Sequence, residues 1–377
     1  MQNKDTPITT IQELKDHLQK ALAVELATIP AYLSGWFTIR NRQNYGDVLH
    51  ILRSITVTEM RHLAVVANTL IAVDGTPDIK AAALTYPHQL PMIDTIKLVR
   101  LLPFGDAYWN QGLAIEQPDP PTCPPFTTGE YHPETGTLTG TSTDISALVR
   151  ELPRLVPEAY MSIGDFYKAV IDGIDYLVQQ KGAGTVFPEG RLGLQYRYFG
   201  GQDNISVRAG EDGADDAKAL LLDIIEEGEG SKDRMWDENR NLSHYYSFDQ
   251  LRKRRLYKYG DAECTPTGGD LSLPSNSDVV RILDDPMMCK YDKDPSAWKA
   301  ADTFNRFYGK ILDNLNIGFS GHLPQVDAAI GQMHQLDTLA QDVLKQPVKN
   351  SNPPAFAAPT FELPPYRGKP IVLPAEL

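Results

Sequence analysis

Apolar residues recur at every third or fourth position along two long stretches near the start of the chain. The first stretch spans residues 10–40, and the second follows a short turn at Asn44–Gly46 and ends at Gly75 and Pro77. This spacing is typical of amphipathic helices that bury one apolar stripe. Two long helices joined by a short turn form an antiparallel hairpin. We expect a kink at Pro30, because proline cannot donate the helical hydrogen bond.

Proline-rich and glycine-rich insertions separate these helices from a second predicted pair. Residues 77–150 contain many prolines, so we expect an extended insertion with short helices at best. A third helix is predicted from about 157 to 178 and a fourth from about 215 to 229. Between them, the insertion at about 180–212 alternates aromatic residues with glycine and is predicted to contain a small β-hairpin. The third and fourth helices would form a second helical hairpin.

The last third of the chain returns to helical patterns and then becomes rich in proline. We predict extra helices between residues 240 and 345, and a tail over 346–377 that packs along the surface. The pattern therefore predicts a mainly α fold. A four-helix bundle with two insertions and extra C-terminal helices would form one domain over 1–345, followed by the tail.

Three ionisable residues fall on the apolar stripes of the first two predicted helices. Glu25 lies on the stripe of the first helix, and Glu59 and His62 lie on that of the second. Buried ionisable groups are unfavourable unless they are paired or bind a metal ion. Glu59 and His62 form an E-x-x-H motif, whose spacing places both side chains on one helix face about 60° apart. One metal ion can therefore contact both of them, together with a carboxylate from the facing helix.

The E-x-x-H motif also has an ordinary structural explanation. Such a motif on a helix is more often a surface ion pair or a packed core histidine than a metal site. Here Val, Leu and Ile residues flank the motif along its stripe, and Glu25 meets the same test for burial on the preceding helix. We therefore predict a metal site. Carboxylates with a few imidazoles suit iron or manganese better than zinc.

The second pair of predicted helices offers less regular candidates. On the third helix, Asp165 faces nearly opposite to the apolar stripe, and Glu158 is a rival on the same face. On the fourth helix, Glu229 shares the apolar stripe and Glu226 lies one position off it. No histidine follows at the E-x-x-H spacing. His244 comes within reach only if the polar segment after Glu229 breaks the helix, and the glycines on either side of Glu229 favour such a break.

Composition narrows the classes of partner. The formal net charge of -13 leaves no basic surface for nucleic acid. No apolar run approaches the roughly 20 residues that span a bilayer, and the start of the chain lacks a signal-peptide pattern. We therefore expect a cytoplasmic protein that binds neither nucleic acid nor membrane. The three cysteines are far apart and odd in number, and we expect them to be free thiols.

Several stretches, in order over nearly the whole chain, resemble one known family. They are ELATIPAYLSGWFTI, ITVTEMRHLAVVANTLIAVDG, YPHQLP, IEQPDPP, SIGDFYKAV, IIEEGEGS, SHYYSFDQL, FNRFYGKILDNL and AAPTFE. The chain is similar in these stretches to the ferritin-like domain family of iminophenyl-pyruvate dimer synthase, the violacein-pathway protein that couples two imines. The first two stretches contain Glu25 and the E-x-x-H motif in their expected contexts.

The resemblance implies a ferritin-like four-helix bundle with a site for two metal ions. The acid of SIGDFY is an aspartate in this chain, where the family usually has glutamate. The ligands that the resemblance implies, four carboxylates and two imidazoles, are Glu25, Glu59, His62, Asp165, Glu229 and His244.

We therefore predict an oxidoreductase or oxygenase that holds two iron ions, with manganese as the other option. It would use dioxygen or peroxide to oxidise a small organic molecule, such as an aromatic amino-acid derivative of secondary metabolism. The pattern names no catalytic residue, and a homodimer is one option for its assembly. The alternative is a metal-free structural or ligand-binding protein on the same scaffold. Iron storage is disfavoured, because long insertions suit a closed shell of small bundles poorly.

Overall fold

Helices dominate the described part of the chain, and the strands there are few and short. This agrees with the predicted mainly α fold. The computed structural model describes residues 8–93, 98–118, 130–132, 137–139, 160–201, 203–230, 235–237, 240–349 and 351–366.

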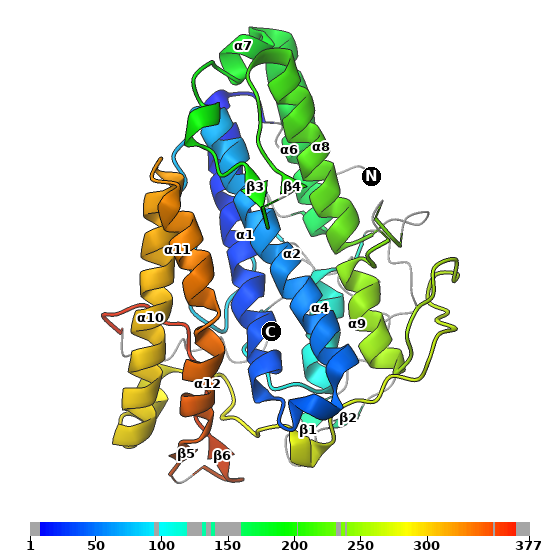
Figure 1. The fold of residues 1–377 in the computed structure, drawn as a ribbon, viewed down its shortest axis with the longest axis vertical. Helices are drawn as coiled ribbons and strands as arrows, with labels where there is room; N and C mark the ends of the chain where they lie inside the picture. Colours follow the sequence, from blue (N-terminus) through cyan, green and yellow to red (C-terminus); the bar gives the residue numbers. More distant parts are fainter. Residues whose placement is uncertain are drawn as a thin grey trace.

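Two long helices form the centre of the fold. α1 (Ile11–Thr38) and α2 (Gly46–Ala72) are joined by the short 3-10 helix η1 (Arg42–Asn44) and lie side by side (Figure 1). α1 begins with a capping box, in which the Thr10 side chain accepts a hydrogen bond from the Glu13 backbone and the Glu13 carboxylate accepts one from Thr10. The predicted first hairpin is present, and α1 continues through Pro30.

The second layer consists of two shorter helix pairs placed end to end. α6 (Ile163–Lys181) and α8 (Gly210–Gly228) pack beside one half of the central hairpin, and α4 (Asp106–Ile115) and α9 (His244–Lys253) pack beside the other half (Figure 1). Gly230 has a φ of 67°, in the left-handed region that favours glycine, so the chain leaves the helix here. The predicted break after the fourth helix is therefore present.

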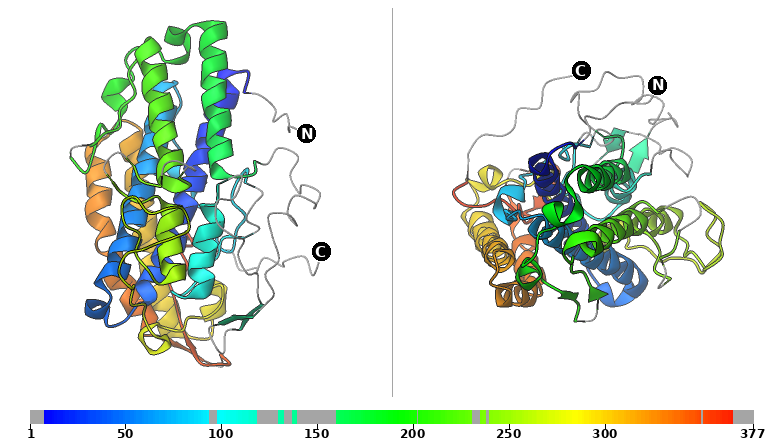
Figure 2. Two further views of the ribbon diagram at one scale, coloured as in Figure 1. Left: turned by 90° about the vertical axis from the view of Figure 1, so that its right-hand side faces the viewer. Right: turned by 90° about the horizontal axis from the view of Figure 1, so that it is seen from above.

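Three C-terminal helices cover the side of α1 that faces away from the second layer (Figures 1 and 2). They are α10 (Pro295–Phe319), α11 (Pro324–Met333) and α12 (Leu336–Leu344). Phe37 of α1 meets Phe304 of α10 edge-on, with ring centroids 6.3 Å apart. Phe361 of the proline-rich tail is only 1% exposed and meets Phe304 and Tyr308 edge-on. This part of the tail therefore belongs to the core, whereas the sequence pattern predicted a surface segment.

Short elements connect these helices. The small hairpin predicted within 180–212 is present as β3 (Tyr198–Phe199) and β4 (Asp203–Asn204), where Tyr198 pairs with Asn204. The short helices are α3 (Ile79–Ala82), α7 (Ala183–Val186), η2 (Leu192–Leu194), η3 (Asn276–Asp278) and η4 (Met288–Tyr291). The strands form the antiparallel pairs β1 (Glu130–His132) with β2 (Thr137–Thr139), β3 (Tyr198–Phe199) with β4 (Asp203–Asn204), and β5 (Pro347–Val348) with β6 (Ala355–Phe356).

Two further findings concern the helices and the cysteines. In the part of the chain that the structure describes, no helix is long and apolar enough to cross a membrane. Cys289 is a free thiol, but Cys264 forms a disulfide, so the prediction of free cysteines is wrong for Cys264.

A glycine on α1 allows α4 to approach closely. A Cβ atom on Gly35 would overlap the ring of Tyr108. That ring cannot easily move aside, because the Tyr108 hydroxyl donates to the Tyr32 carbonyl at 2.9 Å and the ring packs against Phe104 and Phe248. The close contact therefore sets the position of α4 relative to α1.

We expect Gly35→Ala to lower the free energy of unfolding by about 1–3 kcal/mol, because the added methyl group overpacks this contact. Urea denaturation followed by circular dichroism measures the change. Gly46→Ala is the control, since nothing lies within 4 Å of a Cβ atom there. Equal stability of the two variants would mean that α4 adjusts freely on α1.

Candidate metal centre

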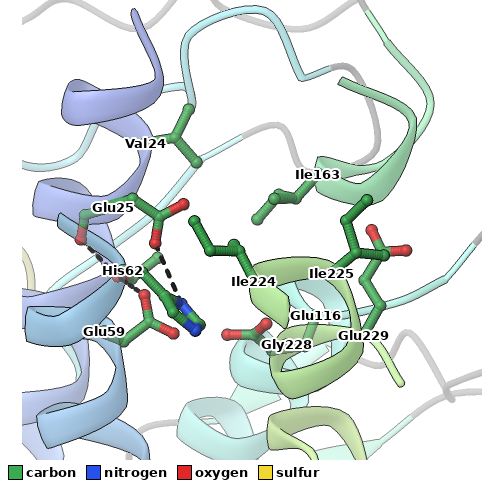
Figure 3. Close-up of a pocket in the computed structure, with 11 residues that line it drawn as sticks. Val24, Glu25, Glu59, His62, Glu116, Ile163, Ile224, Ile225, Gly228 and Glu229 are labelled. Atoms are coloured by element: carbon green, nitrogen blue, oxygen red, sulfur yellow. Dashed lines mark hydrogen bonds and ion pairs between the residues drawn. The ribbon is translucent and has the colours of Figure 1, made fainter. Parts of the chain in front are cut away.

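Glu25, Glu59 and His62 lie together in the interior between α1 and α2. They are 3%, 3% and 1% exposed. The Glu25 Oε2 atom lies 3.4 Å from His62 Nδ1, and Figure 3 shows all three side chains on the same side of one small cavity. The central hairpin therefore brings together the three residues of the predicted first half of the site.

Glu116 and His244 reach the same place from the second layer. Glu116 directly follows the last residue of α4, and His244 is the first residue of α9. Each is 3% exposed. His244 Nδ1 lies 2.7 Å from Glu59 Oε1 and 3.6 Å from Glu116 Oε1. The C-terminal end of α4 and the N-terminal end of α9 thus meet the face of α2 that carries the E-x-x-H motif.

These side chains form two groups that share one residue. Ligand atoms of Glu25, Glu59 and His62 lie within 4.8 Å of one another, and so do those of Glu59, Glu116 and His244. A carboxylate has two oxygens that can each accept a separate partner. Glu59 can therefore contact an ion in each group at once, which defines a candidate site for two ions.

Buried hydroxyl groups orient the carboxylates of the site. Each of the three acids accepts one such hydrogen bond: Glu25 from Tyr167 at 2.5 Å, Glu59 from Thr28 at 2.6 Å, and Glu116 from Tyr32. Hydrogen bonds of this kind fix the orientation of ligands around a metal ion.

The two histidines differ in their outer contacts. His62 turns Nδ1 towards Glu25, and its Nε2 lies 2.8 Å from Glu227 Oε2 on α8. Arg61 also pairs with Glu227, at 3.2 Å. We call the ring nitrogen that points away from the cluster the outer nitrogen. A carboxylate that accepts a hydrogen bond from this nitrogen is a usual way in which a protein orients a histidine ligand. The Nε2 atom of His244 has no such partner among the described residues.

The charges of the cluster compensate one another in part. Burial alone would lower the pKa of His62, but its hydrogen bonds to Glu227 and Glu25 and their charges outweigh this and raise the pKa to about 10. The same balance with its own carboxylate neighbours raises the pKa of His244 to about 9. The two rings therefore carry protons that offset part of the negative charge.

The shared carboxylate shows that this compensation is incomplete. Burial raises the pKa of Glu59 first, and repulsion from Glu116 raises it further, while the His244 contact opposes both. Carboxylates buried close together disfavour each other's charge unless cations compensate them. Metal ions bound among these oxygens would supply that positive charge.

Asp165 and Glu229, the other two predicted ligands, belong to neither group. Asp165 lies in the first turn of α6, where it pairs with Lys168 at 3.4 Å. Glu229 is buried, but its Oε1 accepts a hydrogen bond from the Gly164 backbone at 2.5 Å, and Figure 3 shows its carboxylate turned away from the site. The amino end of α6 attracts this carboxylate, because unpaired backbone N–H groups point outwards there. Glu229 nevertheless lines the same cavity as Glu25, Glu59, His62 and Glu116, and the role of Asp165 and Glu229 as metal ligands stays a prediction.

Glu116 is the residue that sequence reasoning missed. It lies in IEQPDPP, one of the stretches that carry the family resemblance, directly after the buried Ile115. The available signal was an acidic residue directly after an apolar helix. The helical period, however, does not indicate which way a side chain points once the helix has ended. Of the two rivals, Glu226 belongs to neither group, and Glu158 lies outside the described residues.

The donor set fits a pair of iron or manganese ions. Three carboxylates and two imidazoles, all buried, supply hard oxygen ligands and a few nitrogens. The three carboxylates and His62 line a cavity of about 10 Å³, which is room for about one water-sized sphere. The groups thus have the chemistry and the proximity that a dinuclear site needs.

A helical bundle with buried carboxylates and histidines between its helices defines a ferritin-like protein. The chain belongs to the ferritin-like family, whose sequence profile matches residues 18–253. The crystal structure of a ferritin-like protein from Caulobacter vibrioides has a similar fold, at 21% sequence identity and a TM-score of 0.63, covering 94% of this chain and 100% of that chain. No curated protein sequence matches. The predicted ferritin-like fold is therefore confirmed, while the narrower dimer-synthase relationship stays a resemblance.

We expect Glu116→Gln to lower the iron content from about two ions to about one per chain, because Glu116 belongs to only one of the two groups. Elemental analysis of iron-reconstituted protein measures the content. Asp165→Asn is the matched variant and keeps both ions. Loss of iron in Asp165→Asn, with none in Glu116→Gln, would restore the original ligand assignment.

We expect Tyr167→Phe to weaken metal binding about tenfold, because it removes the hydroxyl that orients Glu25. Competition with a coloured chelator measures the affinity. Tyr176→Phe is the control on the same helix, since Tyr176 is 44% exposed. An unchanged affinity in Tyr167→Phe would show that Glu25 needs no support from α6.

Proposed function

We propose that the protein is an oxidoreductase with a dinuclear metal centre, iron or manganese, that acts on a small organic molecule. The observation that carries this proposal is the sharing of Glu59 between two buried groups of metal-type ligands. Membership in the ferritin-like family supports it, because related bundles place carboxylates and histidines for two ions between facing helices.

The residues of the centre have distinct roles in this proposal. Glu25 and His62 would hold one ion, Glu116 and His244 would hold the other, and Glu59 would bridge them. Iron held in this way supplies redox chemistry with dioxygen or peroxide. The protein itself contributes fixed ligand positions and an environment that excludes water, since all five side chains are buried.

Finer features of the proposal come from the family resemblance. The resemblance favours a substrate derived from an aromatic amino acid in secondary metabolism. It also favours the interpretation that this chain is a stand-alone relative of the dimer-synthase domain. A cytoplasmic location and a homodimer also stay predictions. The alternative is a metal-free structural or ligand-binding protein, in which the raised pKa values of the two histidines provide the positive charge.

We expect wild-type protein to bind about two iron ions per chain and to consume dioxygen when ferrous iron is added. We expect Glu59→Ala to lose both ions and the oxygen uptake, because both groups depend on this residue. Elemental analysis and an oxygen electrode measure the two properties.

Glu189→Ala is the control, since Glu189 is an exposed loop residue outside the site. Circular dichroism checks that each variant keeps its helical content. Wild-type protein with less than about a tenth of an equivalent of iron after reconstitution would support the metal-free alternative.

A further inference from the structure

A groove of about 730 Å³ leads from the surface to the metal centre. It lies between α2, α8, α9 and the segment that precedes α9. Its lining includes Glu227, which contacts His62, and His244, which contacts Glu59. The volume falls within the range of small-molecule sites. This groove therefore reaches the second half of the centre.

The walls of the groove carry an excess of negative charge. The described lining residues include five carboxylates, against Arg61 and the imidazole of His244; the acids are Asp203, Asp223, Glu226, Glu227 and Asp237. Three of these acids share the Arg61 guanidinium: Asp203, Asp223 at 3.6 Å and Glu227 at 3.2 Å. Although His62 also pairs with Glu227, the acids at this wall outnumber the cations. Burial and then repulsion from Glu227 raise the pKa of Asp223, while Arg61 opposes this. A further cation at this wall would be favourable.

Three buried polar atoms beside the groove form no hydrogen bond: Ser243 Oγ and both ring nitrogens of His244, of which Nδ1 lies 2.7 Å from Glu59 Oε1 as an ion-pair contact. His244 Nε2 and Ser243 Oγ form no hydrogen bond with any described residue, although each residue is only 3% exposed. Buried polar groups are rarely left unpaired. His62, by comparison, uses its Nε2 for Glu227. Since His244 turns Nδ1 towards the carboxylates, its Nε2 is the nitrogen left to donate outwards, and a hydroxyl can donate beside it.

We propose that this groove binds the organic substrate, and that the substrate is a small aliphatic or aromatic amine that also carries a hydrogen-bond acceptor. The amino group lies against Asp223 and its neighbouring acids, and the acceptor takes hydrogen bonds from His244 and Ser243. This inference rests on the proposed function, because it places the substrate beside the metal ligand His244. It adds the charge of the substrate and the wall that recognises it.

The charge preference is tested with three probes of similar length. Aminopentanol has both a cationic amine and an oxygen acceptor, pentylamine has only the amine, and hydroxypentanoate has an oxygen but the opposite charge. Saturation-transfer NMR on the full chain measures their binding. We expect aminopentanol to bind best, pentylamine more weakly and hydroxypentanoate not at all. Equal binding of hydroxypentanoate and aminopentanol, or no binding of any probe, overturns the inference.

Matched variants test the two walls. We expect Asp223→Asn to weaken aminopentanol binding about fivefold, the order of effect of one partly exposed ion pair. Asp215→Asn, on the same helix but outside the groove and with a side chain that is 77% exposed, should change nothing. We expect Ser243→Ala to reduce the advantage of aminopentanol over pentylamine. Unchanged binding in Asp223→Asn overturns the role of the acidic wall.

Iron content of the same samples separates this inference from the proposed function. We expect Asp223→Asn to keep its iron, so its weaker binding would not arise from a lost metal centre. A wild-type chain that binds aminopentanol but no iron would support the amine-binding groove and refute the proposed oxidoreductase function. A chain that binds iron but none of the amines would refute the groove alone.

Discussion

The burial of three carboxylates and two imidazoles at one point between the helices is the constraint on which the rest of the structure depends. Each charge would be strongly unfavourable there without compensation. The fold compensates with protons on both histidines and with hydroxyl donors from α1 and α6. Because these donors come from separate helices, the packing of the bundle and the geometry of the cluster depend on each other.

The split second layer explains how the cluster is assembled. In a symmetric bundle, the fourth helix carries a histidine three positions after its acid, as α2 does. Here α8 ends at Gly228 and α9 begins at His244, so the imidazole enters from the start of a new helix. On the other side, α4 ends and the next residue is Glu116. Residues at helix ends therefore supply ligands that a continuous helix face would otherwise supply. The segment between α8 and α9 also lines the groove.

The first half of the site could be predicted from the sequence, and the second half only in part. Glu25, Glu59 and His62 lie on regular helices, where the period of apolar residues indicates which side chains face inwards. His244 required a break that two glycines signalled. Glu116 lies beyond a helix end, where no period applies. For Glu229, burial alone does not distinguish a metal ligand from a carboxylate bound at the start of another helix.

The same asymmetry makes the outer nitrogens of the two histidines differ. Glu227 covers the outer nitrogen of His62 and pairs with Arg61, although Glu227 and Arg61 themselves line the groove. The outer nitrogen of His244 has no partner among the described residues, and the groove runs past this ring. A substrate that approaches through the groove would therefore meet the half of the centre held by Glu116 and His244. The half held by Glu25 and His62 would keep its ligands fixed. One centre would thus combine a rigid metal site with a half at which the substrate binds.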